Sequence, residues 1–428
     1  MDRPSGAPAI HIIRNTQFRR LWTAQVLSQS ATSTLLFVLA LRLYQITGSN
    51  TAVSGIFIVY GIPALMIGMV AGTIVDKVEN RTVLMFCDLS RAIISLGFIL
   101  FPTHVAAIYL FTFVNSVITQ FYVPAEGPAI PLLVPKREVV TANSLFSFTY
   151  YTSIALGSIF AGPMLRVFGP IGVFLLLTFM FLAAAANVSR LPRLHRDRSA
   201  RALLGRSLWY LTVRIAANIR EGIGYIRSNR TLVDALLLLV STQVTLAILG
   251  TLGPGFADRV LAIDIRDASL LITGPAVLGI ILGALWVGSF GYRFAKEKLI
   301  QTGIITAGVA LIAVAGIVRL TNVPVLEMIV TGPRVLFLAT ILFFVLGWAN
   351  SLLDVPANSI LQEKAVGNMR GRVYGVLAAA VGGLGVLPVI LGGVLADAVG
   401  VGKVIFFLGI CIFLYGAVRV QYKRQAGK

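Results

Sequence analysis

The sequence contains little charge. Only 12% of its 428 residues are Asp, Glu, Lys or Arg, whereas 57% are hydrophobic, and the mean hydropathy is +0.87. A water-soluble protein of this length needs many more charged side chains to cover its surface. The composition therefore excludes an ordinary soluble protein and favours a chain that lies within a membrane for most of its length.

Catalytic and metal-binding patterns are also scarce. The only histidines are His11, His104 and His195, far apart in the chain, and Cys87 and Cys411 lie in apolar segments where we expect them to be packing residues. Neither the phosphate-binding pattern G-x-x-x-x-G-K-(S/T) nor the nucleophile pattern G-x-S-x-G occurs. We therefore expect neither an enzyme nor an ATP-driven pump, and neither a metal site nor a bound cofactor.

Long apolar runs are abundant instead. About 20 residues of helix cross a hydrocarbon core of about 30 Å, so each run near that length predicts a membrane helix. The first run is too long for the core of a cleavable signal peptide, so we expect it to remain in the protein. The twelve runs lie at about 21–42, 51–75, 82–101, 104–123, 140–164, 170–188, 232–256, 269–290, 299–318, 335–353, 373–395 and 403–418.

The net charge of +19 follows from the arrangement of the loops between these runs. If both termini are cytoplasmic, 28 of the 36 Lys and Arg residues fall in cytoplasmic segments and only six in outer loops. Such a bias is typical of cytoplasmic loops in membrane proteins. We therefore predict a multi-pass protein of the bacterial cytoplasmic (inner) membrane with both termini inside, whose basic surface contacts anionic lipid and not nucleic acid.

The chain contains a weak internal repeat. Val123-Pro124-Ala125 recurs as Val355-Pro356-Ala357, and Gly162 and Gly169 recur as Gly393 and Gly400, while Pro63, Gly68 and Gly72 match Pro275, Gly279 and Gly283. Two halves related in this way are an arrangement found in secondary transporters. The sequence predicts an all-α membrane protein of twelve transmembrane helices in two pseudo-symmetric six-helix bundles, 1–190 and 231–428, joined by a cytoplasmic amphipathic linker, 191–230.

A short charged segment, "AGTIVDKVENRTVLMFCDLSR" at 71–91, separates the second and third runs. Its residues Gly72, Asp76, Lys77 and Arg81 resemble the signature loop of the major facilitator superfamily, G-x-x-x-D-(R/K)-x-G-(R/K)-(R/K). Glu79 replaces the family glycine. The twelve runs, the two halves and the basic central loop are similar to that family as well. The resemblance implies alternating access, in which two halves rock about a central site and this loop acts as a conformational gate.

The same segment supplies further predictions of ion pairs. Asp76 is expected to meet the positive N-terminus of a neighbouring helix, and Arg81 to pair with an acid, for which Glu126 is the candidate. Asp88 and Arg91 are three residues apart, so they share a helix face and can pair with each other. We assign six residues to the conformational gate and expect the last two to form a structural ion pair: Gly72, Asp76, Lys77, Arg81, Asp88 and Arg91.

Polar residues inside the apolar runs indicate a wet cavity. Polar side chains at membrane depth face the bundle interior or water, although each could also serve only as a hydrogen bond between helices. The architecture that the family implies has the first, fourth, seventh and tenth helices lining its cavity, and the fifth run adds two tyrosines. The predicted cavity residues are Gln25, Gln29, Asn115, Thr119, Tyr150, Tyr151, Gln243 and Asn350.

Two acids are candidates for proton coupling. Glu126 lies in "YVPAEGPAIP", where three prolines are expected to disrupt the helix, and Asp354 precedes Pro356 in the matching part of the second half. Burial in apolar surroundings favours the protonated form of a carboxyl group, so either residue can exchange a proton near neutral pH. The alternative for each is a salt bridge to the cytoplasmic loops.

The segments "VPKREVVTANSL", "GSIFAGP" and "NMRGRVYG" resemble the macrolide-efflux and enterobactin-exporter branch of the drug:proton antiporters. That resemblance implies a monomer that exports a small amphipathic compound, drawing energy from the proton gradient. The same segments resemble lysophospholipid transporters, so a lipid flippase of the same fold is an alternative. A receptor or scaffold without transport activity is a second alternative of a different class.

Overall fold

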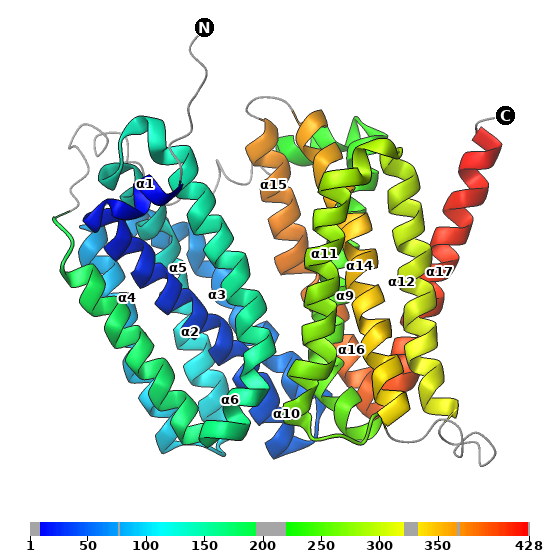
Figure 1. Cartoon of the computed structure of the whole chain (residues 1–428), viewed down its shortest axis with the longest axis horizontal. Coiled ribbons are helices and arrows are strands. Elements are labelled where there is room, and N and C mark those ends of the chain that lie inside the picture. The colour runs from blue at the N-terminus through cyan, green and yellow to red at the C-terminus, as the bar shows by residue number, and fades with distance from the viewer. Residues whose placement is uncertain (1–8, 76–77, 194–219, 321–332, 366–368, 427–428) are drawn as a thin grey trace, which may run out of the picture. The chain divides into compact units, whose positions relative to one another are not determined.

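The computed structural model describes residues 9–75, 78–193, 220–320, 333–365 and 369–426, and nearly all of them are helical (Figure 1). The chain divides into two compact units. Unit 1 comprises residues 1–39 and 56–213, and unit 2 comprises residues 40–55 and 214–428. The end of one helix and the start of the next, at 40–55, therefore pack with the C-terminal half of the chain.

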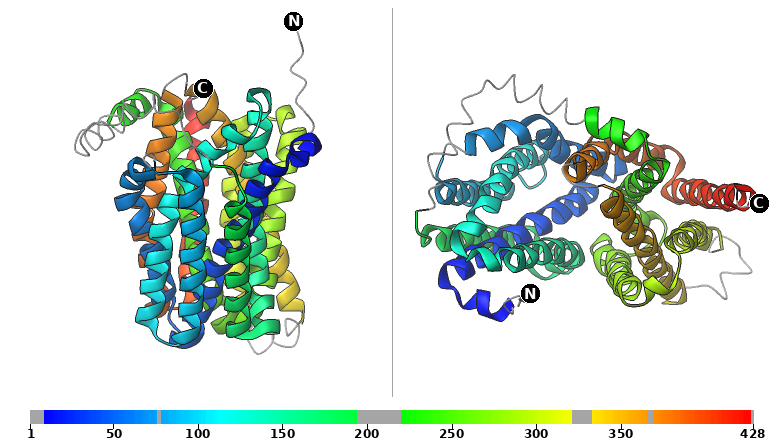
Figure 2. Two further views of the ribbon diagram at one scale, coloured as in Figure 1. Left: turned by 90° about the vertical axis from the view of Figure 1, so that its left-hand side faces the viewer. Right: turned by 90° about the horizontal axis from the view of Figure 1, so that it is seen from above.

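Unit 1 is built from long helices that run side by side (Figures 1 and 2). Helix α4 packs against both α5 and α6. The helices of this unit are α1 (Ala9–Arg14), α2 (Thr16–Thr47), α3 (Asn50–Val75), α4 (Asn80–Leu100), α5 (Val105–Leu133) and α6 (Val139–Ser189), with a short 3-10 turn at Lys136–Glu138. Helices α2 and α3 continue into unit 2 through residues 40–55.

Unit 2 has the same all-helical construction (Figure 1). Helix α14 packs against α11, α12 and α9, while α17 packs chiefly against α12. The helices are α9 (Arg230–Arg259), α10 (Ile265–Ala268), α11 (Gly274–Phe290), α12 (Lys296–Leu320), α14 (Pro333–Lys364), α15 (Met369–Ala379), α16 (Val386–Val399) and α17 (Val401–Ala426), with π-helical turns at Ser269–Thr273 and Ala380–Leu384.

Ten segments among the described residues are long and apolar enough to cross a membrane. One of them, Val139–Ser189, consists of two helices that meet at Gly169, and Asn50–Ala64 is a shorter apolar stretch of α3. The predicted number of twelve is reached only if the two parts of α6 and the whole of α3 are counted as separate spans. The multi-pass, all-α membrane class is confirmed.

The helices extend well beyond the apolar runs. The run at 104–123 belongs to a helix that continues to Leu133, and the run at 335–353 belongs to one that continues to Lys364. An apolar run marks only the part of a helix that hydrocarbon surrounds, whereas the helical hydrogen bonds continue past the membrane surface. Most of the predicted amphipathic linker, at 194–219, lies outside the described residues.

The prediction that prolines disrupt the fourth span is wrong. Helix α5 continues unbroken through Pro124, Pro128 and Pro131. Each proline removes one backbone hydrogen bond, but spans tolerate this where neighbouring helices and side chains satisfy the freed carbonyl groups. Glu126 therefore lies on a continuous helix.

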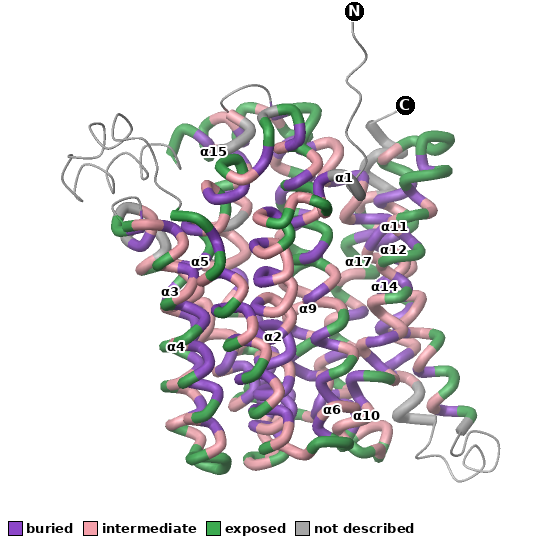
Figure 3. Tube along the Cα trace, turned by 60° about the vertical axis from the view of Figure 1, so that its left-hand side comes forward, coloured by how far each residue is buried: buried purple, intermediate pink, exposed green. Residues whose placement is uncertain are grey.

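Helix α4 shows how the bilayer reverses the pattern of a soluble helix. Phe86, Ile93 and Leu100, spaced seven residues apart, have exposed side chains, whereas Asp88 and Arg91 are buried. Buried and exposed residues alternate along the other helices as well (Figure 3). An exposed apolar stripe is stable only against hydrocarbon, so this face of α4 is a lipid-facing surface.

The repeated glycines occupy equivalent positions in the two halves. Gly169 has φ 65° where the two parts of α6 meet, and Gly400 has φ 100° between α16 and α17. Residues with a side chain rarely adopt positive φ, so both chain reversals favour glycine. The Val-Pro-Ala repeats likewise lie within long helices, on α5 and α14.

Small residues allow α11 and α14 to approach closely. A Cβ atom added to Gly279 would collide with the carbonyl oxygen of Phe344, and one added to Gly347 would collide with that of Ala276. In membranes such contact between backbones replaces the hydrophobic effect as a source of helix association. Gly288, on the same helix α11, has open space around it.

We therefore expect Gly279→Ala to destabilise the protein by about 1–3 kcal/mol, because the added methyl group forces the two backbones apart. The matched control Gly288→Ala should leave stability unchanged or raise it by up to about 1 kcal/mol, through helix propensity alone. Thermal unfolding of both variants in detergent measures the difference. Equal stability of the two variants would show that the α11–α14 contact does not depend on Gly279.

Candidate functional site

The predicted gate lies only partly within the described residues. Asp76 and Lys77 fall outside them, and their role stays a prediction. Gly72 lies on α3 with open space around it, and the guanidinium of Arg81 donates to the carbonyl oxygen of Ser189 at 2.5 Å. Arg81 thus holds the start of α4 against the end of α6, where the sequence suggested Glu126 as its partner.

Asp88 and Arg91 form the ion pair that their spacing predicts. Arg91 Nη1 lies 3.6 Å from Asp88 Oδ1, with side-chain exposures of 3% and 0%. Ser28 on α2 bridges the two charges, because its hydroxyl donates to Asp88 Oδ1 at 2.6 Å and accepts from Arg91 Nη1 at 2.8 Å. Arg91 Nη2 also donates to Thr119 at 3.0 Å, and its guanidinium lies 4.6 Å from the ring centroid of Tyr122.

We call Ser28, Asp88, Arg91, Thr119 and Tyr122 the Arg91 cluster. It joins α2, α4 and α5, and a second aromatic ring, Phe181 on α6, lies 5.9 Å from the guanidinium. Ring faces attract cations, so the two rings stabilise the arginine without adding a negative charge. A buried charge is stable only when it is paired and hydrogen-bonded, as both charges are here.

The Arg91 cluster is not fully satisfied. Among the described residues, Asp88 Oδ2, Arg91 Nε and Glu126 Oε1 are buried and have no hydrogen-bond partner. Glu126 lies one turn beyond Tyr122 on α5, and both Asp88 and Arg91 act on it electrostatically. Glu126 thus lies within the electrostatic reach of the Asp88–Arg91 pair, and each of the two carboxyl groups has an oxygen that can accept a proton or a water molecule.

The predicted cavity residues of unit 1 have different surroundings. Gln25 is buried and donates to the carbonyl oxygen of Phe146, and Gln29 donates to Ser33. Thr119 belongs to the Arg91 cluster, and the amide oxygen of Asn115 is buried without a partner among the described residues. Tyr150 and Tyr151, in contrast, are exposed on α6, with their rings edge to face at 5.4 Å.

Unit 2 contains a second polar cluster around Asp354. Asn358 donates to Asp354 Oδ2 at 3.1 Å, and the hydroxyl of Tyr374 donates to Asn358 at 3.5 Å. Gln243 of α9 lies beside the same carboxylate. The sequence placed Gln243 and Asp354 on different helices, and the structure brings them together. Asn350, one turn earlier on α14, faces a cavity of about 470 Å³ in unit 2.

Asp397, at the end of α16, accepts five hydrogen bonds. Its carboxylate accepts backbone N–H groups of Asn50 and Thr51 at 2.9 Å each, and also the Asn50 amide at 2.9 Å, the Ser49 hydroxyl at 2.6 Å and the Thr51 hydroxyl at 2.7 Å. Arg259 lies 3.8 Å from this carboxylate and donates to the carbonyl oxygen of Gly48 at 2.6 Å. We call these six residues the Asp397 cluster.

Helix electrostatics explain the position of Asp397. A carboxylate in the last turn of a helix is unfavourable, because the helix dipole places partial negative charge there. The N-terminus of α3 compensates, since it supplies free N–H groups and partial positive charge. The acid of one helix thus caps the start of another that lies about 350 residues earlier in the chain.

Sequence reasoning missed Ser28 and Asp397. Ser28 lies between Gln25 and Thr32 at a spacing of three and four residues, so the helical period could have placed it on the same face. Asp397 is an acid in the apolar stretch "VLADAVG", and a charge in such a stretch requires a partner. The identity of that partner could not be found, because nothing in the sequence joins Asp397 to residues 48–51.

The long apolar helices, the buried ion pair and the polar clusters are features of a multi-pass membrane protein. The family model of the Major Facilitator Superfamily matches residues 21–326, and the chain belongs to this family.

The curated relatives are transporters. The "Uncharacterized MFS-type transporter YfiS" of Bacillus subtilis is 21% identical over 92% of this chain and 89% of its own length. The "Multidrug efflux pump Tap" of Mycolicibacterium fortuitum is 25% identical over 85% of each chain. The "Putative bacilysin exporter BacE" of Bacillus amyloliquefaciens is 22% identical over 84% of this chain and 83% of its own.

Solved structures support the fold. The nucleoside transporter NupG superposes with a TM-score of 0.69 at 14% identity, covering 94% of this chain and 98% of its own. A bacterial homologue of the human lysosomal transporter Spinster, in an inward-facing conformation, superposes with a TM-score of 0.66 at 13% identity, covering 95% of both chains. The major facilitator fold expected from the sequence is therefore confirmed.

The Arg91 cluster makes a prediction about stability. Asp88→Asn leaves the buried arginine unpaired, and Arg91→Met leaves the buried carboxylate unpaired, so each should destabilise the protein by about 3–5 kcal/mol. The double variant leaves neither charge, and its loss should be clearly smaller than the sum of the two. Thermal unfolding in detergent measures all three.

An exposed ion pair provides the control. Glu363 pairs with Lys296, and their side chains are 61% and 38% exposed, respectively. Glu363→Gln breaks this pair and should change the free energy of unfolding by less than about 1 kcal/mol. Simple addition of the Asp88 and Arg91 effects would contradict an ion pair that functions as a unit.

Proposed function

We propose that the chain is a secondary active exporter of a small amphipathic compound, driven by proton antiport. It acts as a monomer in the bacterial cytoplasmic membrane with both termini inside. The observation that carries the proposal is that the carboxyl groups of Asp88 and Glu126 both feel the charge of Arg91, and that each has a buried oxygen without a hydrogen-bond partner among the described residues. The names of Tap, a multidrug efflux pump, and BacE, a putative exporter, support the direction of transport.

Charge accounting explains why this arrangement suits a proton carrier. With both carboxyl groups ionised, Asp88, Arg91 and Glu126 together carry one negative charge, and a single proton makes the set neutral. A neutral set is the more stable one when hydrocarbon and protein surround it, and a charged set is more stable when water has access. Protonation therefore favours closed surroundings, and access to water at the cytoplasmic side favours release of the proton.

Export then results when inward movement of a proton is coupled to outward movement of the amphipathic compound. A proton from outside binds a carboxylate oxygen, with Glu126 Oε1 as the favoured acceptor, and the same proton is released inside. Moving one proton through 100 mV provides about 2.3 kcal/mol, enough to concentrate a solute by tens-fold. Asp354 in unit 2 retains an unpartnered oxygen among the described residues and serves as a second candidate for proton exchange.

The Asp397 cluster supports alternating access. It holds the turn between α2 and α3 within unit 2, although both helices continue into unit 1. We infer that these hydrogen bonds act as a latch on the outer side, formed when that side is closed and broken when it opens. The signature loop at Gly72, Asp76, Lys77 and Arg81 would play the corresponding part at the cytoplasmic side.

Proton coupling is tested by transport into proteoliposomes under an imposed pH gradient, with an amphipathic fluorescent dye as the solute. Wild-type transport should rise with the gradient, whereas Glu126→Gln should lose about tenfold or more of the gradient-driven rate, because the proton acceptor is missing. Glu363→Gln, which changes an exposed acid, serves as the control and should transport normally. Wild-type transport that does not depend on the gradient would rule out antiport.

The latch is tested by the accessibility of Ser54, which is buried and donates to the carbonyl oxygen of Val389. In a chain without Cys87 and Cys411, Ser54→Cys should react slowly with an impermeant maleimide added outside. Asp397→Asn should raise that rate about tenfold or more, since charge-assisted hydrogen bonds contribute about 1.5–3 kcal/mol. Thr51→Ala, which removes only one hydrogen bond, should have a smaller effect. An unchanged rate in Asp397→Asn would contradict the latch.

A further inference from the structure

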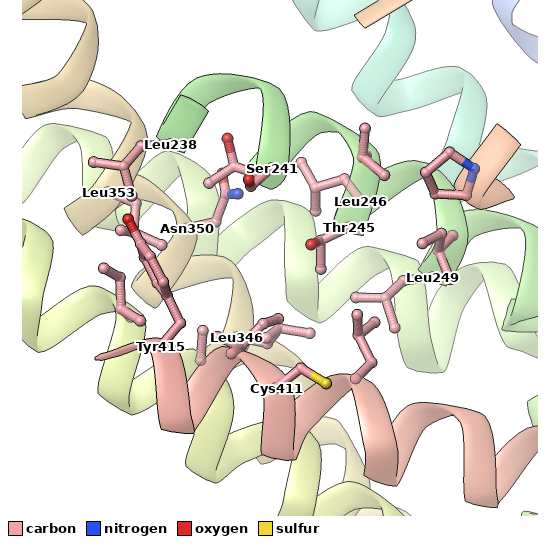
Figure 4. Close-up of a pocket in the computed structure, with 18 of the residues that line it drawn as sticks. Leu238, Ser241, Thr245, Leu246, Leu249, Leu346, Asn350, Leu353, Cys411 and Tyr415 are labelled. Atoms are coloured by element: carbon pink, nitrogen blue, oxygen red, sulfur yellow. The ribbon is translucent and has the colours of Figure 1, made fainter. Parts of the chain in front are cut away.

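A cavity of about 470 Å³ lies inside unit 2, between α9, α14 and α17 (Figure 4). Its volume falls in the range of about 300–1,000 Å³ that is usual for pockets holding small ligands. Aliphatic side chains form most of the wall, among them Leu238, Leu249, Leu346 and Leu353. The cavity belongs to one unit and is distinct from the Arg91 and Asp397 clusters.

Three polar groups point into this apolar space. Figure 4 shows Ser241 and Thr245 on α9 and Asn350 on α14 directed into the cavity. Within the described part of the chain, none of the three side chains makes a hydrogen bond. Ser241 is exposed and Thr245 and Asn350 are half-buried, so all three remain accessible to a hydrogen-bonding ligand in the cavity.

Among the residues that the structure describes, the lining contains no Asp, Glu, Lys, Arg or His. Just beyond it, Arg419 donates to the hydroxyl of Tyr415 at 3.4 Å and lies 3.9 Å from Asp234, so this nearby charge already has a partner. A charged ligand would leave its own charge buried and unpaired, which is costly. The cavity therefore selects a ligand without a net charge.

The rim of the cavity carries exposed side chains of two apolar helices. Leu237 of α9 and Tyr415 of α17 both line it, and their side chains are 54% and 50% exposed. Both helices are long and apolar enough to cross a membrane, so an opening between them lies at membrane depth. A molecule that dissolves in the bilayer can reach the cavity without crossing water.

We propose that this cavity binds an uncharged single-chain amphiphile, with its chain along the leucines and its hydroxyl or carbonyl group bonded to Ser241, Thr245 and Asn350. The inference rests on the proposed function for its biological meaning, because such a molecule would be the exported compound or its apolar part. Binding itself is independent of transport and is measured without a gradient.

Cys411 provides a native reporter, because it lines the cavity and is exposed, whereas Cys87 is buried elsewhere. The experiment measures the rate at which N-ethylmaleimide modifies Cys411 in the Cys87→Ala protein, reconstituted in phospholipid nanodiscs. The added probe is 1-monolauroylglycerol, and the matched charged probes are dodecyltrimethylammonium and dodecyl sulfate. A cysteine at Leu414, which is exposed on the same helix but outside the cavity lining, in a Cys411→Ala background, is the control site.

Monolauroylglycerol should slow modification of Cys411 about fivefold or more at saturation, since the reagent and the probe compete for one space. The charged probes should protect much less at the same concentration, and the control cysteine should not be protected at all. Asn350→Leu should raise the concentration needed for half protection about tenfold, as one hydrogen bond to a buried group is lost.

Ser241→Ala, a smaller change, repeats the test in case Asn350→Leu fails to fold, and thermal unfolding shows which variants are folded. Equal protection by charged and uncharged probes would overturn the proposal. Complete protection by nanodisc phospholipid alone would also overturn it, because a lipid chain would then occupy the cavity. If the protein binds monolauroylglycerol but exports no dye under a pH gradient, the binding site is supported and the proposed function is contradicted.

Discussion

The cost of leaving a charged side chain in hydrocarbon determines where this chain places its few ionisable groups. Helix α4 carries an apolar stripe outward and the Asp88–Arg91 pair inward, and Ser28 of α2 bridges the two charges. Each inward polar group therefore needs partners from neighbouring helices, and those partners fix how the helices pack. For the same reason, a buried oxygen atom without a protein partner indicates a place where a proton, a water molecule or a ligand can form the missing hydrogen bond.

The two halves carry different chemistry at matching positions. If the offset of the Val-Pro-Ala repeat is extended, Tyr122 of α5 corresponds to Asp354 of α14, and Glu126 corresponds to Asn358. Each half thus has one acid near its repeated proline, but at alternate turns of the helix. The acid of unit 1 lies near an arginine, whereas the acid of unit 2 lies among amide and hydroxyl groups. A shared helical framework therefore presents an ionic cluster in one half and a neutral hydrogen-bonded one in the other.

Local patterns predicted much of this structure, and long-range contacts could not be predicted. Apolar runs and the spacing of Asp88 and Arg91 depend on neighbours in sequence, so the spans and the ion pair were accessible. The prolines of α5 were misread because the sequence does not show which neighbouring groups satisfy the freed carbonyls. The partners of Asp397 lie near residue 50, and no periodicity joins the two segments. The polar side chains that face the unit 2 cavity are placed there by packing among five helices, which composition does not encode.

Because residues 40–55 belong to unit 2, a cut in the central linker does not separate the two units cleanly. A polypeptide that began in the central linker would carry Asp397 and Arg259 without the turn that satisfies them. It would then expose an uncapped acid at a surface that the complete chain covers. The C-terminal half of the sequence therefore lacks part of the compact unit to which it belongs.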